Sequence, residues 1–385
     1  MDRQEKVRLL ARAAQFDLCA PHSQAAPSIC THQTPESSRR CTDVAQWLYP
    51  AALPNGKHLA LLKILQTNMC DNNCFYCGMR RARNVQRCDF SPEELASVFD
   101  QLVHRGVAEG LFLSSAVCDS AARTQERMIA TVELVRFRYH FSGYIHLKLL
   151  PGCDPAAVER AVQIANRVSV NLEAPNAHRL RRLSADKRFE QDLVQTMHWA
   201  RRFLDQDANA LADITTQFVV GAAGESDREI LATTEGLHRS VGLTRTYFSA
   251  FRPVLDTPLD NLPATPLLRQ NRLYQSDYLL RRYGFTLNDL CFDADDNLCR
   301  DTDPKLAWAR MHSGFFPVEI NHAAREELLR VPGIGPRSVA RILRLRRQRT
   351  FRDLQDLRSV GAVAARAAPF ILLSGRRPPA QLALC

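Results

Sequence analysis

Three cysteines, Cys70, Cys74 and Cys77, lie within eight residues of one another at the spacing C-x3-C-x2-C. Three thiolates on one loop can hold a metal centre, because the thiolate is the form of cysteine that binds metals. The set is one ligand short of a structural zinc site and of a simple electron-transfer iron–sulfur cluster, each of which takes four. A [4Fe–4S] cluster held by these three cysteines would leave one iron open to a substrate or cofactor.

Two other interpretations of these cysteines are open. Cys88 follows Cys77 by eleven residues and could complete a zinc site, although no second closely spaced pair follows it. The cysteines could also be unrelated small core residues, since free cysteine is often buried.

The spacing, with Tyr76 directly before the third cysteine, resembles the signature of the radical S-adenosylmethionine (SAM) enzymes. That resemblance implies a [4Fe–4S] cluster whose open iron chelates the amino and carboxylate groups of SAM. It implies one-electron cleavage of SAM into methionine and a 5′-deoxyadenosyl radical. It also implies an electron donor, such as a flavodoxin or a ferredoxin.

The composition is that of a globular protein. The 385 residues are enough for one large and one small domain, and 45% of them are hydrophobic and 24% charged. No apolar run approaches the length of a membrane span, and the charged N-terminus lacks the apolar stretch of a secretory signal. Twelve cysteines without an export signal favour reduced thiols and metal binding, which predicts a cytoplasmic protein.

The net charge of +10 is concentrated near the C-terminus. From Leu306 to Cys385 there are 14 arginines and 5 acidic residues, a net charge of +9, whereas the remaining 305 residues carry 37 basic and 36 acidic groups. A basic segment joined to a near-neutral body predicts that this segment contacts a polyanion. A solvated arginine-rich helix face is the alternative.

The chain divides on its sequence pattern into five segments. We expect an N-terminal extension (1–57), a barrel (58–255), a connecting region (256–317), a helical domain (318–373) and a tail (374–385). In the extension, Met1–Cys19 has helical periodicity and Pro21–Thr42 reads as loop, while the evenly spaced Cys19, Cys30 and Cys41 match no ligand pattern. In the connecting region, Asp293–Asn297 lacks the later ligands of a calcium loop and predicts a polar turn.

Residues 58–255 alternate short apolar runs with helical stretches, which predicts an α/β fold with a parallel sheet and right-handed crossovers. Ser91-Pro92-Glu93-Glu94 begins one helix as a capping box with proline at the first helical position. By resemblance, the six repeats imply the partial (β/α)6 TIM-like barrel of the radical SAM family. The expected strands are His58–Leu65, Gly110–Ser114, Tyr144–Leu149, Arg167–Leu172, Ile214–Val220 and Thr246–Ala250, and the expected helices are 91–104, Gln125–Tyr139, Asp154–Ala165, Arg188–Asp205 and Ser226–Ser240.

The same resemblance implies that SAM is bound at the ends of the strands, where barrels build their sites. The methionyl amino group would lie at the end of the second strand, although the Gly-Gly-Glu form common in the family is missing there. The ribose hydroxyls would lie at the fourth strand, and adenine beside the cluster loop and the fifth strand. The residues implied are Ser114 and Ser115 for the amino group, Asn171 and Glu173 for ribose, and Tyr76, Gly78 and Gly221 for adenine.

Residues 318–373 repeat a helix–turn–helix pattern twice. The first copy turns at Val331–Pro336, where glycines would let the backbone approach an anion and a helix N-terminus adds partial positive charge. The second copy turns at Val360-Gly361-Ala362 and keeps one glycine. The stretch resembles tandem helix-hairpin-helix DNA-binding domains, although such hairpins also serve as protein–protein modules. The residues expected to contact DNA are Gly333, Ile334, Gly335, Arg337, Ser338 and Arg341.

A radical SAM core followed by such a tail resembles a bacterial family of radical SAM proteins described as acting in DNA modification or repair. The resemblance covers residues 58–373 and does not specify the reaction. Two further hypotheses are an RNA-modifying radical SAM enzyme and a non-catalytic iron–sulfur protein that binds DNA or senses redox state.

Overall fold

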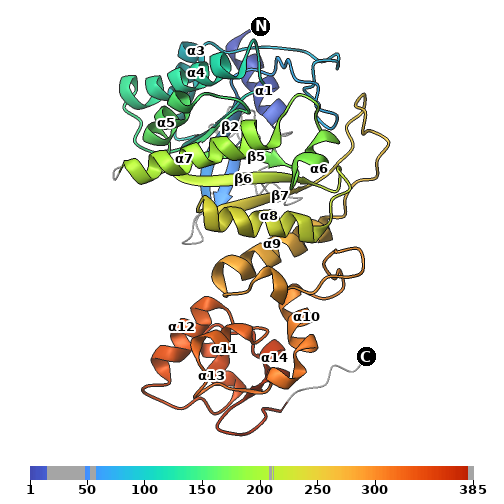
Figure 1. Ribbon diagram of the computed structural model, residues 1–385. Helices are drawn as coiled ribbons and strands as arrows, with labels where there is room; N and C mark the ends of the chain where they lie inside the picture. Colours follow the sequence, from blue (N-terminus) through green and yellow to red (C-terminus); the bar gives the residue numbers. More distant parts are fainter. Residues whose placement is uncertain (15–47, 53–57, 208–209, 211, 380–385) are drawn as a thin grey trace, which may run out of the picture. The chain divides into compact units, whose positions relative to one another are not determined.

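The structure is a computed structural model that describes residues 1–14, 48–52, 58–207, 210 and 212–379 (Figure 1). The expected loop Pro21–Thr42, with Cys30 and Cys41, lies outside the described residues, as does Cys19. The chain forms two compact units. Unit 1 comprises Met1–Glu225 and Leu237–Thr265, and unit 2 comprises Ser226–Gly236 and Pro266–Cys385.

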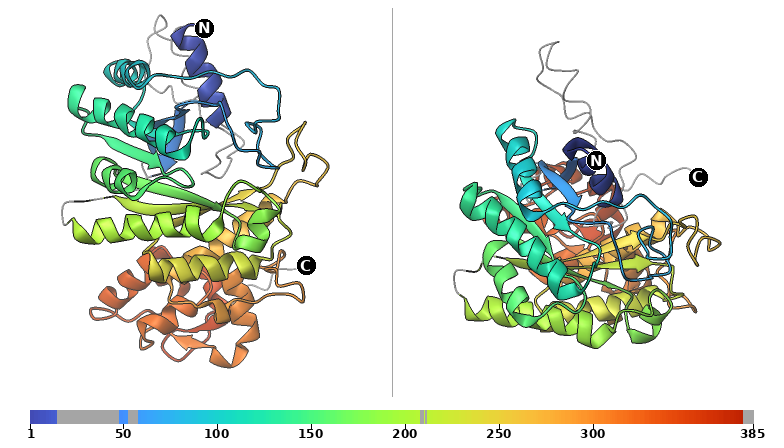
Figure 2. Two further views of the ribbon diagram at one scale, coloured as in Figure 1. Left: turned by 45° about the horizontal axis from the view of Figure 1, so that its top comes forward. Right: turned by 90° about the horizontal axis from the view of Figure 1, so that it is seen from above.

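Unit 1 is built on a seven-stranded sheet in the order β1-β2-β3-β4-β5-β6-β7, whose curl is visible in Figure 2. The last six strands are parallel, and β1 (Leu48–Ala52) pairs antiparallel with β2. The six parallel strands are those expected from the sequence, with ends that differ by one residue at most. They are β2 (His58–Leu65), β3 (Gly110–Ser114), β4 (Tyr144–Lys148), β5 (Arg167–Glu173), β6 (Asp213–Val220) and β7 (Arg245–Ala250).

Helices cover the outer face of this sheet (Figures 1 and 2). The capping box predicted at Ser91 is present, with the Ser91 hydroxyl accepting from the Glu94 N–H and Pro92 at the first helical position. Among the described residues, the helices of unit 1 are α1 (Arg3–Ala13), α3 (Pro92–His104), α4 (Ala121–Glu133), α5 (Pro155–Ile164), α6 (Ala177–Arg181) and α7 (Gln195–Gln206). A π-helical turn at Leu134–Arg138 follows α4, and another at Phe189–Val194 precedes α7. Helix α8 (Asp227–Ser240) contains residues of both units.

Each parallel strand has one apolar and one more polar face, because successive side chains of a strand point to opposite sides. On β4, Ile145 and Leu147 are fully buried, and His146 lies between them with its Nε2 2.8 Å from Ser169 Oγ of β5. Side chains of β2 and β7, which are not neighbours in the sheet, line one cavity together with His146, as only side chains inside the curl can. The inside of the barrel is therefore lined by polar as well as aromatic groups.

Unit 2 is mainly helical, and the helix that follows β7 lies where the sequence predicted only a connecting region. That helix, α9 (Leu267–Arg282), buries Gln270, Ser276 and Asp277 alongside two leucines, so its apolar residues show no helical periodicity. The buried Asp277 carboxylate is paired with Arg281 one turn later at 2.7 Å. The other elements are α10 (Pro304–Met311), α11 (Arg325–Arg330), α12 (Pro336–Leu345), α13 (Leu354–Ser359), α14 (Ala364–Ala367) and a short parallel pair, β8 (Val318–Glu319) with β9 (Ile371–Leu372).

The four helices α11 to α14 form two helix–turn–helix pairs that pack reciprocally around a shared apolar core. The turn of the first pair contains Gly333 (φ +85°), whose carbonyl accepts from the Val363 N–H of the second pair at 2.8 Å. The turn of the second pair contains Gly361 (φ +80°), and Arg341 of the first pair donates to the carbonyl of Val360 beside it. Each turn is thus held against a helix of the other pair.

Asp293–Asn297 is a polar turn, as predicted. The Asp293 carboxylate accepts from the N–H groups of Asp295 and Asn297, at 2.9 Å each. That side chain is therefore used to hold the turn itself.

Lys305 of α10 lies beneath the first turn. Its side chain is buried, its Nζ donates to the Ile334 carbonyl at 2.6 Å, and it lies over the Tyr283 ring. Burial lowers the pKa of Lys305 to about 7, and the nearby Arg366 and Arg330 act in the same direction, against Asp303.

We expect the pKa of Lys305 to make the stability of the protein depend on pH. Between pH 7 and pH 10.5, Lys305 holds its proton in the unfolded chain but has released it in the folded protein. The free energy of unfolding should therefore rise with pH through that window, and this gain is lost as the pH falls back to 7. Thermal unfolding of the protein and of Lys305→Met, measured from pH 7 to pH 10, checks this. The variant should lack this part of the pH dependence, and parallel curves would contradict the assignment.

Candidate cofactor site at the ends of the strands

The three cysteines lie on the long loop that follows β2, residues 66–90, which is tied to the neighbouring strand. At its beginning, the Gln66 N–H donates to the Ser114 carbonyl at 2.8 Å, and the Asp71 N–H donates to the Val117 carbonyl at 2.8 Å. The end of the loop closes onto its start, where the Phe90 N–H donates to the Gln66 carbonyl at 3.0 Å. The cysteines are therefore fixed over the C-terminal edge of the sheet.

A single guanidinium braces the loop from within. Arg87 donates to the carbonyls of Asn68 and Met79 through one terminal nitrogen, and to those of Arg80 and Arg83 through the other, at 2.5 to 3.0 Å. The planar fork of arginine suits this task, because it presents several donors in fixed directions. The residues on both sides of the cysteines are thus held to one point.

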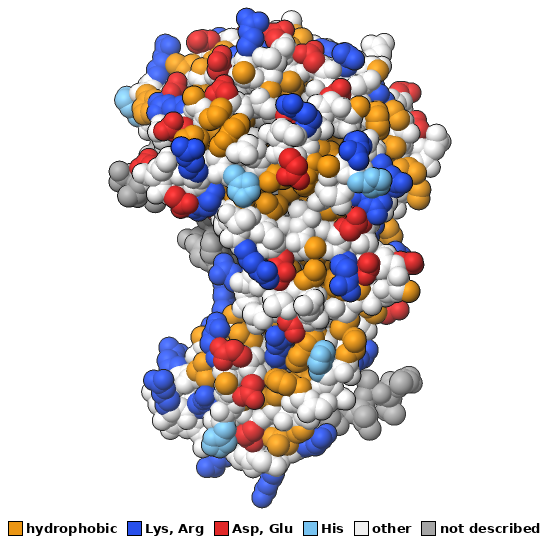
Figure 3. Space-filling view, in the orientation of Figure 1, with side chains coloured by type: hydrophobic (Ala, Val, Ile, Leu, Met, Phe, Trp, Pro, Cys, Tyr) orange, Lys and Arg blue, Asp and Glu red, His pale blue; other side chains and the backbone are white. Residues whose placement is uncertain are grey.

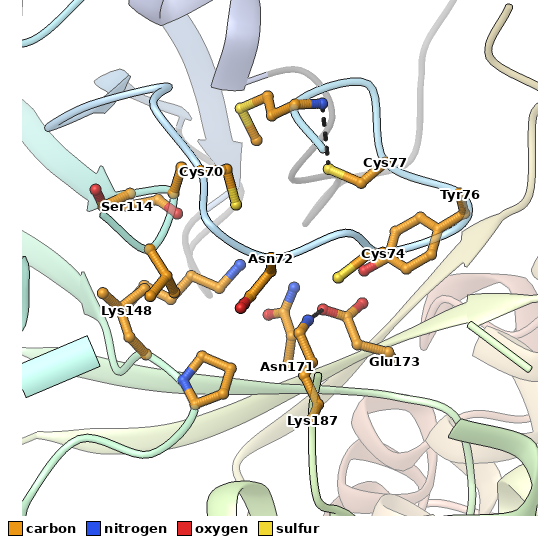
Figure 4. Close-up of a pocket in the computed structure, with 16 residues that line it drawn as sticks. Cys70, Asn72, Cys74, Tyr76, Cys77, Ser114, Lys148, Asn171, Glu173 and Lys187 are labelled. Carbon is orange, nitrogen blue, oxygen red and sulfur yellow. Dashed lines mark hydrogen bonds and ion pairs between the residues drawn. The ribbon is translucent and has the colours of Figure 1, made fainter. Parts of the chain in front are cut away.

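Cys70, Cys74 and Cys77 line one pocket together (Figure 4). No group of three or more His, Cys, Asp or Glu side chains in the described part of the chain is arranged to hold a single metal ion. In a cluster each thiolate binds a different iron, so the three thiols need not converge on a single ion. Cys88 is not among the residues that line this pocket, and the charges that affect its thiol are those of Lys6, Asp89 and Glu5, so the position of Cys88 gives no support to a zinc site completed by it.

The thiols sit in surroundings that disfavour free thiolates. Burial raises the pKa of Cys77 to about 12, and the charge of Cys74 acts in the same direction. Burial also raises the pKa of Cys70. Metal binding must therefore displace protons from these cysteines, and the charge of the metal is what makes this favourable.

The opposite wall of the pocket is made by Glu173 at the end of β5. The register of β5 against β6 shifts between Asn171 and Glu173, and Glu173 adopts φ +65°, which side chains other than glycine rarely do. A bulge of this kind re-aims a side chain, and such features cluster near functional sites. Here it turns the Glu173 carboxylate toward the cysteine loop.

Glu173 forms a buried polar cluster with two residues from other segments. Lys187 pairs with its carboxylate at 3.0 Å, with side-chain exposures of 9% for the lysine and 5% for the glutamate. Burial disfavours the charged form of Lys187, but the negative charge of Glu173 outweighs this and raises the pKa of the lysine. Burial and the Glu173 charge likewise raise the pKa of Tyr76, whose hydroxyl is hydrogen-bonded to Glu173.

The structure brings together most of the residues that the sequence singled out as cofactor contacts. Tyr76, Ser114, Ser115, Asn171 and Glu173 all line the same pocket as the three cysteines, and Figure 4 shows Asn171 and Glu173 facing the cysteine loop across it. Among the described residues, the buried hydroxyl of Ser115 has no hydrogen-bond partner, so it is available to a ligand in the pocket.

Two of the singled-out glycines lie elsewhere. Gly78 lines a separate hollow against α1, together with Leu9 and Arg12. Gly221 does not line the pocket, and a Cβ on it would collide with the Thr265 side chain, while its N–H donates to the Glu225 carboxylate. The glycine at 221 is therefore explained by local packing at φ +94°.

Several lining residues were missed by sequence reasoning. Lys148 is the last residue of β4, and Leu150 and Pro151 follow it, so their position at a strand end was the signal that could have identified them. Lys187 and Asn72 carried no such signal, because only the folded loops bring them to the pocket. The residues missed are Asn72, Met79, Ala116, Val117, Lys148, Leu150, Pro151 and Lys187.

The site fits an iron–sulfur cluster together with a polar cofactor. Three thiols on one braced loop provide soft ligands for iron. The pocket beside them offers a buried hydroxyl, an amide and an ion-paired carboxylate, which can bind amino, carboxylate or hydroxyl groups of a second molecule.

Comparison with known proteins agrees with this reading. Residues 64–236 match the model of the radical SAM superfamily, a span that contains β3 to β6 and the cysteine loop. No curated protein matches the sequence.

Among solved structures, the chain resembles methylornithine synthase (PylB) at 14% identity, with a TM-score of 0.47, over 72% of this chain and 76% of that one. It resembles HydG, a maturase of the [FeFe]-hydrogenase, at 13% identity and a TM-score of 0.46, over 72% of this chain and 63% of that one. It also resembles the methyltransferase TsrM from Kitasatospora setae at 14% identity and a TM-score of 0.40, over 52% and 38% of the two chains.

The family match covers the cysteine loop and the strands whose ends carry the pocket, and the enzymes of this superfamily use a [4Fe–4S] cluster and SAM. The chain therefore carries a radical SAM superfamily domain, and the protein is a radical SAM enzyme.

Proposed function

We propose that this radical SAM enzyme acts on DNA and modifies or repairs it. The observation that carries the proposal is the pair of helix–turn–helix units in unit 2, with a Gly-Ile-Gly turn and an arginine-rich second helix. We assign these units to the helix-hairpin-helix class. Hairpins of this kind bind phosphates through backbone N–H groups and a helix N-terminus, which gives affinity without sequence reading.

The arginines of unit 2 divide into two groups. Some support the fold: Arg346 donates to the Ala323 carbonyl at 2.7 Å, and Arg330 pairs with Asp289 and stacks on Phe285. Others, namely Arg337, Arg344 and Arg347 on or just after α12, are exposed. In Figure 3, Lys and Arg side chains gather along the side of unit 2 where Figure 1 labels α12. The exposed group is suited to phosphates.

Two of the residues expected to contact DNA at the turn have buried side chains. Ile334 and Ser338 are 1% and 5% exposed, so their side chains belong to the core of the unit. Arg341 is exposed but also donates to the Val360 carbonyl. Contacts with DNA at the turn would therefore use the backbone around Gly335 and the exposed arginines.

In the barrel, we assign Cys70, Cys74 and Cys77 to the three liganded irons. Ser114 and Ser115 would hold the amino group of SAM, and the remaining polar residues of the pocket its ribose: Asn171 and Glu173, with Lys187 fixing Glu173. Tyr76 would lie beside adenine. When bound, the cluster and SAM supply a 5′-deoxyadenosyl radical at this pocket. The electron would come from a separate donor such as a flavodoxin or a ferredoxin.

The experiment that tests the proposal is mass spectrometry of nucleosides after incubation of nucleic acid with the reconstituted, reduced enzyme and SAM. DNA, RNA and no nucleic acid are run in parallel, with Cys77→Ala as the inactive control. A new or altered deoxynucleoside, together with stimulated release of 5′-deoxyadenosine, is expected with DNA. Products from RNA alone, or SAM cleavage that neither nucleic acid stimulates, would overturn the assignment to DNA.

A further inference from the structure

A second concentration of positive charge lies in unit 1, on the segment that joins β5 to α7. Residues 177–188 contain five basic residues, Arg179, Arg181, Arg182, Lys187 and Arg188, and one acidic residue, Asp186, a net charge of +4 in twelve residues. The near-neutral total of the first 305 residues conceals this local excess.

This segment forms part of the rim of the cofactor pocket. The Phe75 N–H of the cysteine loop donates to the Leu183 carbonyl at 2.7 Å, and the Asn73 N–H donates to the Asp186 carboxylate at 2.5 Å. Ser184 Oγ lies 3.3 Å from Cys74 Sγ. The segment therefore runs alongside the cysteine loop at the ends of the strands (Figure 1).

The one acidic group within the segment is already engaged by the cysteine loop, whereas several of the basic groups face solvent. Arg181 and Arg182 are both exposed, and neither has a carboxylate partner among the residues that the structure describes. Arg182 donates to the Ala223 carbonyl at 3.1 Å, which leaves its charge uncompensated. Arg81, on the neighbouring cysteine loop, is exposed as well. Arg188 differs, because it is paired with Asp192 at 2.7 Å.

We propose that Arg181 and Arg182, together with Arg81 of the cysteine loop, form a second contact for the phosphate backbone of DNA, at the mouth of the cofactor pocket. This inference rests on the proposed function. Exposed arginines without carboxylate partners are the groups that bind phosphates, bidentately where the geometry allows. Their place at the rim means that a strand held there presents a nucleotide to the pocket.

The burial of the pocket behind these arginines also indicates which conformation of DNA could react there. Cys74, Asn171 and Glu173 are 6%, 6% and 4% exposed, so a reacting group must enter the pocket to reach them. A base within a duplex cannot do so, and enzymes that act on bases take them out of the stack. The rim would therefore hold the backbone on either side of a nucleotide that has left the helix.

The test compares three double variants of the full-length protein: Arg181→Glu/Arg182→Glu, Arg181→Lys/Arg182→Lys, and Arg105→Glu/Arg138→Glu as a matched control. Arg105 and Arg138 are exposed arginines of the same unit that follow α3 and α4, at the opposite ends of the strands. Affinity for single-stranded and duplex DNA is measured as a function of salt. For the Glu pair at the rim, the slope of log affinity against log salt should become shallower by about 1.8 with duplex DNA and about 1.4 with single strands, since each lost phosphate contact removes about 0.9 and about 0.7 respectively.

The Lys pair should retain most of the slope, and the control pair should behave as the wild type. Iron content and the release of 5′-deoxyadenosine without DNA should be unchanged in all three, while stimulation by DNA is lost only in the Glu pair at the rim. An unchanged slope in that pair, with wild-type binding that still depends on unit 2, would overturn the rim contact and leave the proposed function standing. No binding of DNA by the wild type would overturn both.

Discussion

Replacing Cys70, Cys74 or Cys77 by alanine should abolish the iron–sulfur cluster. Three cysteines are the minimum that can hold a [4Fe–4S] cluster with one open iron, and the described residues around the pocket offer no spare thiol: Cys88 lies outside it. Anaerobic reconstitution of the wild type should give about four irons per chain, and each variant should fall close to zero. Iron analysis, visible absorption and release of 5′-deoxyadenosine would all register the loss.

Cys291→Ala is the matched control, because Cys291 is a free cysteine of unit 2 and does not line the pocket. It should retain the full iron content and wild-type SAM cleavage. A Cys74→Ala variant that kept its iron, or a wild type that took up zinc alone, would refute the cluster assignment.

Gly333→Ala should disrupt unit 2 while leaving the cluster intact. A Cβ at this position would lie 2.5 Å from the Val363 carbonyl oxygen and 3.0 Å from the Arg366 side chain, so the two helix–turn–helix pairs could not stay in contact. The backbone at φ +85° adds strain for any residue other than glycine. Overpacking costs roughly 1–3 kcal/mol and a left-handed backbone roughly 1–2 kcal/mol. The free energy of unfolding should fall by roughly 2–5 kcal/mol, the sum of these two costs. DNA binding should be largely lost.

Gly314→Ala is the control for this variant, since a Cβ on Gly314 would meet nothing within 4 Å. Denaturant unfolding, DNA affinity and iron content should be measured for both variants. Wild-type stability and DNA affinity in Gly333→Ala would show that the contact between the two pairs is dispensable, and a loss of iron would show that the damage reaches the barrel.

At Gly333, the sequence predicts that a side chain is excluded, and the structure shows which neighbour excludes it. The Gly-Ile-Gly turn predicts a close backbone approach, which on the sequence alone a bound anion would explain. The structure shows that a protein neighbour already occupies one side of Gly333, namely the Val363 carbonyl. A glycine marks where a side chain is excluded, but it does not indicate which neighbour excludes it.

The sequence alone determined the parallel strands and the cysteine loop. Apolar runs such as Leu111–Leu113 and the capping box at Ser91 are local signals, since they arise from residues close together in the chain. The spacing of the three cysteines is also local. These features could be read without knowledge of the fold, because the physical cause of each lies within a few residues.

Only the tertiary structure decided what surrounds the cysteines. The bulge at Glu173 depends on the register of β5 against β6, and the pairing of Glu173 with Lys187 depends on a loop that returns to the pocket. Helix α9 escaped prediction because it buries polar side chains that find partners in the folded state, as Asp277 does with Arg281. The basic rim was hidden in the sequence for a similar reason: net charge sums over the whole chain, whereas a phosphate responds only to the charges that the fold places near it.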